Sequence, residues 1–407
     1  MQILRNILVT GLFLSLILFL GGSTIPTDAW GFFGHRRINR MAVFTLPTDM
    51  IGFYKRNIEF ITEHAVDPDK RRYATRHEAV RHYIDIDHWG EYPFDEVPRK
   101  WMDALMKYTD IYSIDFQGDT THLFGKNRFA RVGFSLNGSN NPYRDFFYHN
   151  VLPEYYEDEW NIACDSLNAL LATPVDCQKA IAVDRFSEYG ILPYHLVQYY
   201  RQLIRAFEDK NFNRILRLSA EIGHYVGDAH VPLHTTENYN GQLTNQVGIH
   251  AFWESRLPEL YADENYDFFV GKSEIIEDPN EFFWNIVLES HQLLDSVLLI
   301  EQDLREQFPE DQQMCYEERL GRTIRTQCEV FAKAYHERLS GMVERRMTAA
   351  IHALGCVWYS AWVEAGQPDI NSLQPQEMSR RERKRLEIEA KEIQKGESKG
   401  RAHSSEF

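Results

Sequence analysis

The sequence is short of positive charge. Its 407 residues carry 44 lysine and arginine residues against 60 aspartate and glutamate residues, which gives a formal net charge of −16. Nucleic acids and anionic membranes attract proteins through clustered basic side chains, so this composition argues against a general binder of either. Any phosphate-bearing substrate must therefore be held locally, by a metal ion or by a small basic patch.

Cysteine is also scarce. The chain has five cysteines, and none of them forms a CxxC motif, so a zinc site built from thiolates is not predicted. In an exported protein Cys164 with Cys177, and Cys315 with Cys328, could each close a short loop and leave Cys356 over. The alternative is that all five are buried free thiols.

The sequence also lacks the alternation of apolar and polar residues that marks β-strands. Helical patterns of apolar residues instead cover Tyr194–Val231, with a break near Asn211, and the ranges Asn280–Glu306 and Glu317–Val363. A long insertion at about residues 100–190 is less regular, and we expect short helices and loops there. Hydrophobic residues make up 43% of the chain, enough for a sizeable core. We predict an all-α fold.

The two ends of the chain differ from the rest. An apolar run at Ile7–Leu20 leads into a small and polar stretch that ends at Ala29, which is typical of a signal peptide. We expect residues 1–29 to be removed before Trp30 and the protein to be exported, to the periplasm or outside the cell. An uncleaved membrane anchor is the alternative. Residues 367–407 are highly charged, and we expect a disordered tail or a frayed helix.

Between residues 221 and 258 the chain concentrates imidazole and carboxylate side chains. Two pairs stand four residues apart in helical patterns, so each pair leaves one face of its helix. A further histidine follows the proline that ends the first of these helices. Either pair alone is more often an ordinary surface or core pair, but imidazole and carboxylate together suit zinc, and the full set predicts a metal site. The five candidates are His224, Asp228, His234, His250 and Glu254.

Cleavage before Trp30 would create another kind of ligand. The free amino nitrogen of Trp30 and its own carbonyl oxygen can chelate a metal ion, and His35 could complete that site. The alternative is that Trp30 packs and His35 caps a helix. Asp67 and His82 are further candidates along the chain. Lys70 belongs to a small basic cluster that we expect on a solvated helix face, or against a phosphate.

Taken in chain order, these residues form a recognisable set of motifs. WGFFGH, AVD, RHYIDID, GHYVGDAHVPLH and GIHAFWE resemble the superfamily that joins the zinc-dependent phospholipases C to the single-strand-specific zinc nucleases of the S-one/P-one type. The resemblance covers the chain from Trp30 to about Pro258. It implies a multi-helix fold with three zinc ions in one cleft, and hydrolysis of a phosphodiester by zinc-activated water. We expect no obligate protein partner.

The resemblance also implies a role for each candidate. Asp228 and Asp67 are the candidate catalytic residues, and Asp228 would be shared by two of the ions. Asp69 lies two residues further on, but the spacing to His82 and the preceding Ala65-Val66 favour Asp67. The implied ligands are Asp67, His82, His224 and Asp228 for one zinc, His234, His250 and Glu254 for a second, and Trp30, His35 and the shared Asp228 for the third.

Two classes of phosphodiester remain open. The short spacing from Trp30 to His35 resembles the nucleases, and Tyr83 and Asp85 stand where nucleases hold a base with an aromatic ring and an acid. Glu254 and the short loop before the last ligand pair resemble the phospholipases instead, and the acidic net charge disfavours nucleic acid. We predict a nuclease-like enzyme that acts on single-stranded nucleic acid or nucleotides. A phospholipase C and a non-catalytic zinc-binding scaffold are the alternatives.

Overall fold

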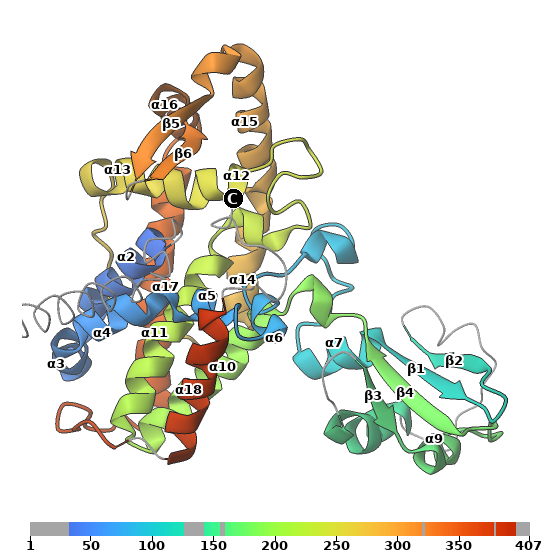
Figure 1. The fold of residues 1–407 in the computed structure, drawn as a ribbon. Helices are drawn as coiled ribbons and strands as arrows, with labels where there is room; N and C mark the ends of the chain where they lie inside the picture. Colours follow the sequence, from blue (N-terminus) through green and yellow to red (C-terminus); the bar gives the residue numbers. More distant parts are fainter. Residues whose placement is uncertain (1–31, 126–141, 155–158, 320–321, 378–379, 396–407) are drawn as a thin grey trace, which may run out of the picture.

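The computed structural model describes residues 32–125, 142–154, 159–319, 322–377 and 380–395. The fold is mostly helical, with a smaller unit that contains a four-stranded sheet to one side of a helical body (Figure 1). In these ranges no helix is both long and apolar enough to cross a bilayer. The expected leader peptide and Trp30 lie outside the described residues, so cleavage and the N-terminal ligand remain predictions.

Helices α10 and α11 form the centre of the body. α10 spans Leu192–Glu208 and α11 spans Phe212–Ala229, which confirms the break that the sequence predicts. The side chain of Asn211 accepts a hydrogen bond from the backbone N–H of Arg214 and so caps the start of α11. Both helices pack against the long α17 (Met342–Glu364), and buried apolar side chains from all three fill the main core.

Shorter elements surround this centre and build a second core beside α15 and α16. Of these, α14 and α15 confirm the helical pattern expected over residues 280–306. In chain order the elements are α2 (Phe32–Ala42), η1 (Val43–Thr45), α3 (Thr48–Arg56), α4 (Ile58–Glu63), η2 (His64–Val66), α5 (Asp67–Arg71), α6 (Arg76–Ala79), η3 (Ile86–Trp89), η7 (Pro232–Thr235), α12 (Ile249–Ala251), the π-helix η8 (Phe252–Arg256), α13 (Leu257–Asn265), α14 (Pro279–Gln292), α15 (Leu294–Gln307), η9 (Glu310–Gln312) and α16 (Glu329–Arg338).

The insertion corrects the all-α prediction. It contains an antiparallel sheet in the order β2-β1-β4-β3 and has a hydrophobic core of its own. Strand β1 does alternate in burial, but two of its three buried positions are Thr109 and Ser113, so the apolar pattern was hidden. The elements are α7 (Trp101–Tyr108), β1 (Thr109–Ile114), β2 (Thr120–Phe124), α8 (Pro142–Phe146), the π-helix η4 (Phe147–Val151), η5 (Leu152–Glu154), β3 (Glu159–Ile162), α9 (Cys164–Leu170), β4 (Lys179–Asp184) and η6 (Ser187–Tyr189).

A second correction falls at the start of the helical pattern predicted over residues 317–363. Here β5 (Met314–Arg319) and β6 (Arg322–Gln327) form a two-stranded hairpin, and helix begins again only at α16. The hairpin carries charged and polar residues on both faces, so it shows no clear strand alternation. A disulfide joins Cys315 to Cys328, another joins Cys164 to Cys177, and Cys356 is a buried free thiol. This is the pairing that the loop spacing suggested.

The charged tail forms a helix, α18 (Arg380–Gln394), which contacts α5 and lines one cavity together with residues of α10 and α11 (Figure 1). Glu389 Oε1 lies 4.0 Å from Nε of Arg71 on α5. The segment that leads to α18 also stays on the body, since Ile370 is fully buried and the Asn371 side chain donates to the carbonyl of Asp49. Within the tail, residues 380–394 therefore form a helix that packs on the body.

Candidate metal centre

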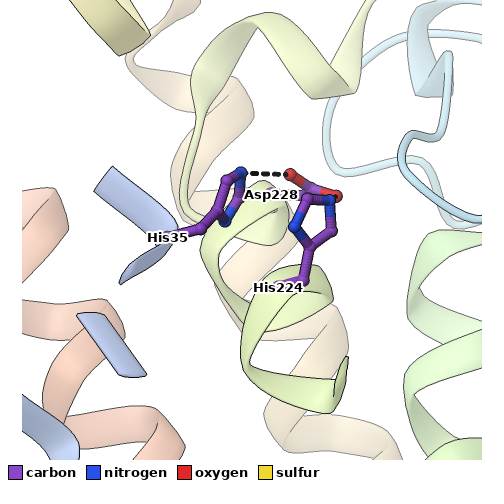
Figure 2. Close-up of side chains that lie close together, drawn as sticks. All are labelled: His35, His224 and Asp228. Carbon is purple, nitrogen blue, oxygen red and sulfur yellow. Dashed lines mark ion pairs between the residues drawn. The ribbon is translucent and has the colours of Figure 1, made fainter. Parts of the chain in front are cut away.

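The candidate metal centre lies where α2, α5, α11 and the segment from η7 to η8 meet. α11 presents His224 and Asp228 one turn apart, as their spacing predicts, and both side chains are fully buried. α2 places His35 beside them. The His35 ring stacks on His224 with centroids 3.9 Å apart, and its Nε2 lies 3.4 Å from Oδ1 of Asp228 (Figure 2).

Two glycines on α11 let α2 come this close. A Cβ atom at Gly227 would lie 2.8 Å from Nδ1 of His35, and one at Gly223 would lie 1.9 Å from Oδ1 of Asn39. The Asn39 side chain donates to the carbonyl of Ala220 at 2.9 Å and so ties α2 across α11. Because Gly223 and Gly227 have no Cβ atom, α2 can pack close to α11, and this packing sets the distance between His35 and Asp228.

Asp228 stands between two sets of imidazoles. Its Oδ2 lies 3.0 Å from Nδ1 of His82 and 3.4 Å from Nε2 of His224. Its Oδ1 lies 3.4 Å from Nε2 of His35 and 3.8 Å from Nε2 of His234. Since each oxygen faces a different set, this carboxylate is placed to be shared between two cations.

The second predicted pair sits on irregular helix. His250 belongs to the single turn α12, and Glu254 to the π-helix η8 that follows it. Glu254 Oε2 lies 2.8 Å from Nε2 of His250 and 3.5 Å from Nε2 of His234. Trp253 and Leu257, which flank Glu254 on this segment, are both buried. Short π-helical turns are frequent at functional sites because they redirect side chains from the regular helical face.

Backbone carbonyls orient two of the imidazole rings. Nδ1 of His224 donates to the carbonyl of Ala65 at 2.9 Å, and Nδ1 of His234 donates to the carbonyl of His82 at 2.6 Å. The other nitrogen of each ring, Nε2, then faces the centre as an acceptor. Metal-binding histidines are commonly held in this way, because the donated N–H fixes the tautomer.

Asp69, rather than the predicted Asp67, lies in the centre. Asp69 Oδ1 is 3.6 Å from Nε2 of His224 and 3.8 Å from Nδ1 of His82. Asp67 instead accepts a hydrogen bond from Nζ of Lys70 at 2.9 Å and is partly exposed. Both aspartates belong to the turn α5, and residues two apart on a helix point in different directions. The spacing along the chain did not reveal which of them faced inward.

Burial and neighbouring charge make the carboxylates of the centre unlike one another. Burial raises the pKa of Asp228 well above its ordinary value, and the charges of Glu254 and Asp69 raise it further. Burial also acts to raise the pKa of Glu254, but the neighbouring imidazoles of His234 and His250 hold it well below its ordinary value. A divalent cation between these carboxylates would offset the repulsion of Asp228 by Glu254 and Asp69.

Buried polar atoms that lack a hydrogen-bond partner indicate whether these residues could bind a metal ion. Among the described residues, neither nitrogen of His35 has a hydrogen-bond partner, and neither does Oδ1 of Asp228, although all three atoms are buried. Buried polar atoms are rarely left in this state. Imidazole and carboxylate ligands with nitrogen oriented inward fit zinc. Three groups offer ligand atoms that lie within 4.8 Å of one another: His35, His224 and Asp228; Asp69, His82 and His224; and His234, His250 and Glu254.

Two of the three predicted substrate-binding residues line a cavity that the ligand groups do not line. Tyr83 and Lys70 line a cavity of about 1650 Å³ between α18 and the body, and no member of the three ligand groups lines it. The Tyr83 hydroxyl donates to the carbonyl of Glu188 at 3.1 Å, and the ring is buried. Asp85 is buried as well. Tyr83 and Lys70 therefore face this cavity rather than the three ligand groups.

Two further buried charges lie beside the centre: Glu78, which was not predicted from the sequence, and Arg72, which belongs to the basic cluster that contains Lys70. Glu78 Oε1 accepts a hydrogen bond from the hydroxyl of Tyr225 and lies 3.9 Å from Nε2 of His82. Arg72 has Nη1 3.9 Å from Oδ1 of Asp69. Glu78 and His82 stand four residues apart, the same spacing that drew attention to His224, so a signal for Glu78 was present.

Two comparisons with known sequences find no match. No protein-family model matches the chain, and a search of curated proteins finds no match. The geometry of the centre is therefore the basis of the function proposed below.

Proposed function

We propose that this chain is a zinc-dependent phosphodiesterase. One observation supports this most: buried imidazoles and carboxylates from separate parts of the chain converge around Asp228. Structural histidines would each be expected to bond to a neighbouring group, whereas here imidazole nitrogens from several elements point toward the same carboxylate, Asp228. The residues that would hold the ions are His35, Asp69, His82, His224, Asp228, His234, His250 and Glu254.

Each part of the centre would have a distinct task. Zinc supplies Lewis acidity and lowers the pKa of a water molecule to about 7. Asp228 would be a ligand common to two metal ions and would fix their separation, because its two oxygens face different imidazoles. Burial excludes bulk water, so charges act on a phosphate more strongly than they would at the surface. Arg72 adds a fixed positive charge beside Asp69.

The acidic composition is consistent with this proposal. A phosphodiester is an anion, and a chain of net charge −16 must attract it locally. A centre loaded with divalent ions provides that attraction without a basic surface. We keep single-stranded nucleic acid as the first substrate to test because of the motif resemblance, and phospholipid as the second.

The test combines metal analysis with a substrate panel. Protein purified from an exporting host is assayed for zinc and then for hydrolysis of single-stranded DNA, RNA, phosphatidylcholine vesicles and bis(p-nitrophenyl) phosphate. We expect bound zinc, hydrolysis that a chelator abolishes and zinc restores, and a loss of at least about 100-fold in Asp228→Asn. Cleavage of lipid alone would assign the phospholipase class. Zinc without any hydrolysis would favour a scaffold, and protein without zinc would refute the proposal.

A further inference from the structure

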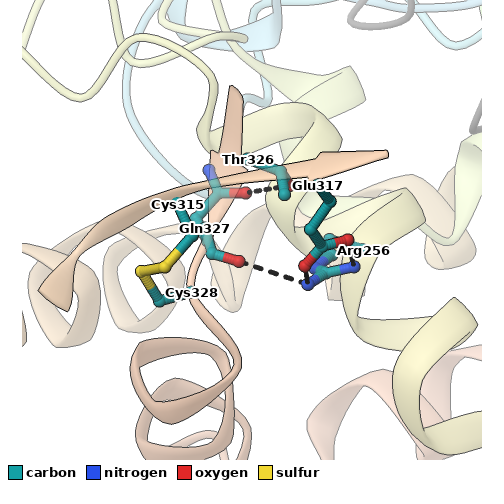
Figure 3. Close-up of a disulfide and its surroundings, with 6 residues drawn as sticks. All are labelled: Arg256, Cys315, Glu317, Thr326, Gln327 and Cys328. Atoms are coloured by element: carbon teal, nitrogen blue, oxygen red, sulfur yellow. Dashed lines mark hydrogen bonds and ion pairs between the residues drawn. A yellow bond between two sulfur atoms is a disulfide. The ribbon is translucent and has the colours of Figure 1, made fainter. Parts of the chain in front are cut away.

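Arg256 is an unusual side chain to find beside a candidate metal ligand. It ends the π-helix η8, two residues after Glu254, and only 2% of it is exposed. Its Nη1 donates to Oε2 of Glu317 at 3.0 Å, and its Nη2 donates to Oε1 of the same carboxylate. Nη2 also reaches the carbonyl of Gln327 at 3.3 Å (Figure 3). The guanidinium thus joins the π-helix to both strands of the hairpin β5–β6.

The disulfide lies next to both of these acceptors. Cys315 is two residues before Glu317 on β5, and Cys328 directly follows Gln327 at the end of β6 (Figure 3). An isolated two-stranded hairpin is marginally stable in water. The covalent bond therefore fixes the distance between the two strands that hold the guanidinium.

A second contact from the same part of the chain supports η8. The ring of Phe252, at the start of η8, packs on Tyr335 with centroids 4.7 Å apart and on Phe331 at 5.7 Å. Both rings belong to α16, the helix that follows the hairpin. The hairpin and α16 therefore contact η8 at both of its ends, with Glu254 between them.

We propose that the disulfide-closed hairpin positions Glu254, acting through Arg256, and so sets the metal affinity of the group that contains His234 and His250. The inference rests on the metal centre proposed above. A buried guanidinium that loses its carboxylate must find another partner or admit water. Either response moves the irregular turn that carries Glu254. Arg256 and Glu317 are thus positioning residues, since neither belongs to the three ligand groups.

Two pairs of variants test this. Glu317→Gln removes the charge that Arg256 binds, and Glu318→Gln is its control, because Glu318 is the next residue on β5 and contacts Thr323 instead. The double variant Cys315→Ser/Cys328→Ser opens the hairpin. Cys164→Ser/Cys177→Ser is its control, since both disulfides join cysteines 13 residues apart and this one lies in the insertion.

The readouts are zinc affinity, measured by competition with a chromophoric chelator, and the visible absorption of the cobalt-substituted protein. We expect Glu317→Gln and the Cys315/Cys328 variant to weaken one zinc site by about tenfold or more and to change the cobalt spectrum, with both controls unchanged. Wild-type affinity in the two test variants, or an equal loss in the controls, would overturn the inference. A wild-type protein without zinc would overturn the proposed function as well, so the two failures are distinguishable.

Discussion

Gly227→Ala is the most informative single substitution in the centre. The added Cβ would lie 2.8 Å from Nδ1 and 3.1 Å from Cε1 of His35. Ordinary contacts of this kind begin at 3.4 Å, so the ring must retreat by about 0.6 Å. Zinc–nitrogen bonds are about 2.0–2.1 Å long and tolerate deviations of about 0.2 Å. We therefore expect the group of His35, His224 and Asp228 to lose its geometry.

The expected loss falls on metal binding more than on folding. Alanine gains about 1 kcal/mol over glycine in a helix interior, whereas overpacking costs about 1–3 kcal/mol. The free energy of unfolding should therefore change by at most about 2 kcal/mol. Zinc affinity at the His35 group should fall by about tenfold or more, because the displacement exceeds what the bond length tolerates. Urea unfolding and zinc competition on the same preparation measure both quantities.

Two further glycines serve as controls. A Cβ at Gly34 would come no closer than 3.9 Å to the carbonyl of Glu254, so Gly34→Ala should leave zinc affinity unchanged. A Cβ at Gly223 would lie 1.9 Å from Oδ1 of the buried Asn39, so Gly223→Ala should cost more in unfolding free energy than Gly227→Ala does. If Gly227→Ala bound zinc as tightly as the wild type, the packing of α2 on α11 would not set the position of His35.

Asp69→Asn should lower zinc affinity by at least about tenfold while Asp67→Asn leaves it nearly unchanged, because only Asp69 faces the ligands; competition titration distinguishes the two, and the reverse order would restore the sequence-based assignment. Burial, aided by the charges of Arg81 and Arg71, holds the pKa of His195 well below 6.5. Its contribution to the unfolding free energy is then complete above pH 6.5 and falls by up to about 1.4 kcal/mol per pH unit below it, since only the unfolded chain takes up the proton. Urea unfolding from pH 7.5 to 5.0 should show a shallower pH dependence in His195→Leu, and an unchanged slope would refute this.

Local patterns predicted the helices of the body well. The period of apolar residues located α10 and α11, and Asn211 supplied the break between them because its side chain caps the second helix. Both disulfides join the cysteines that the loop spacing suggested. These features depend on residues that lie close together in the chain, which is why the sequence reveals them.

Strand β1 and the hairpin β5–β6 were missed because polar residues occupy many of their positions. In β1 the buried side chains include Thr109 and Ser113, and in the hairpin β5–β6 charged and polar residues together outnumber the apolar ones. The hairpin is also held by a partner elsewhere in the chain, the buried Arg256 that binds Glu317. A pattern search within one strand cannot contain that information.

The residues of the metal centre also fall into two kinds: those predicted from local spacing and those brought together by the packing of distant helices. His224 with Asp228, and His250 with Glu254, were found from the sequence because both members of each pair belong to one helical segment. The meeting of His35 with Asp228 depends on how closely α2 approaches α11, and a glycine at position 227 permits it. Asp228 is fully buried among like charges, which raises its pKa, and its Oδ1 has no hydrogen-bond partner among the described residues. Since a folded chain rarely retains such a cost unless something offsets it, the packing of these two helices is itself an argument that a cation belongs between them.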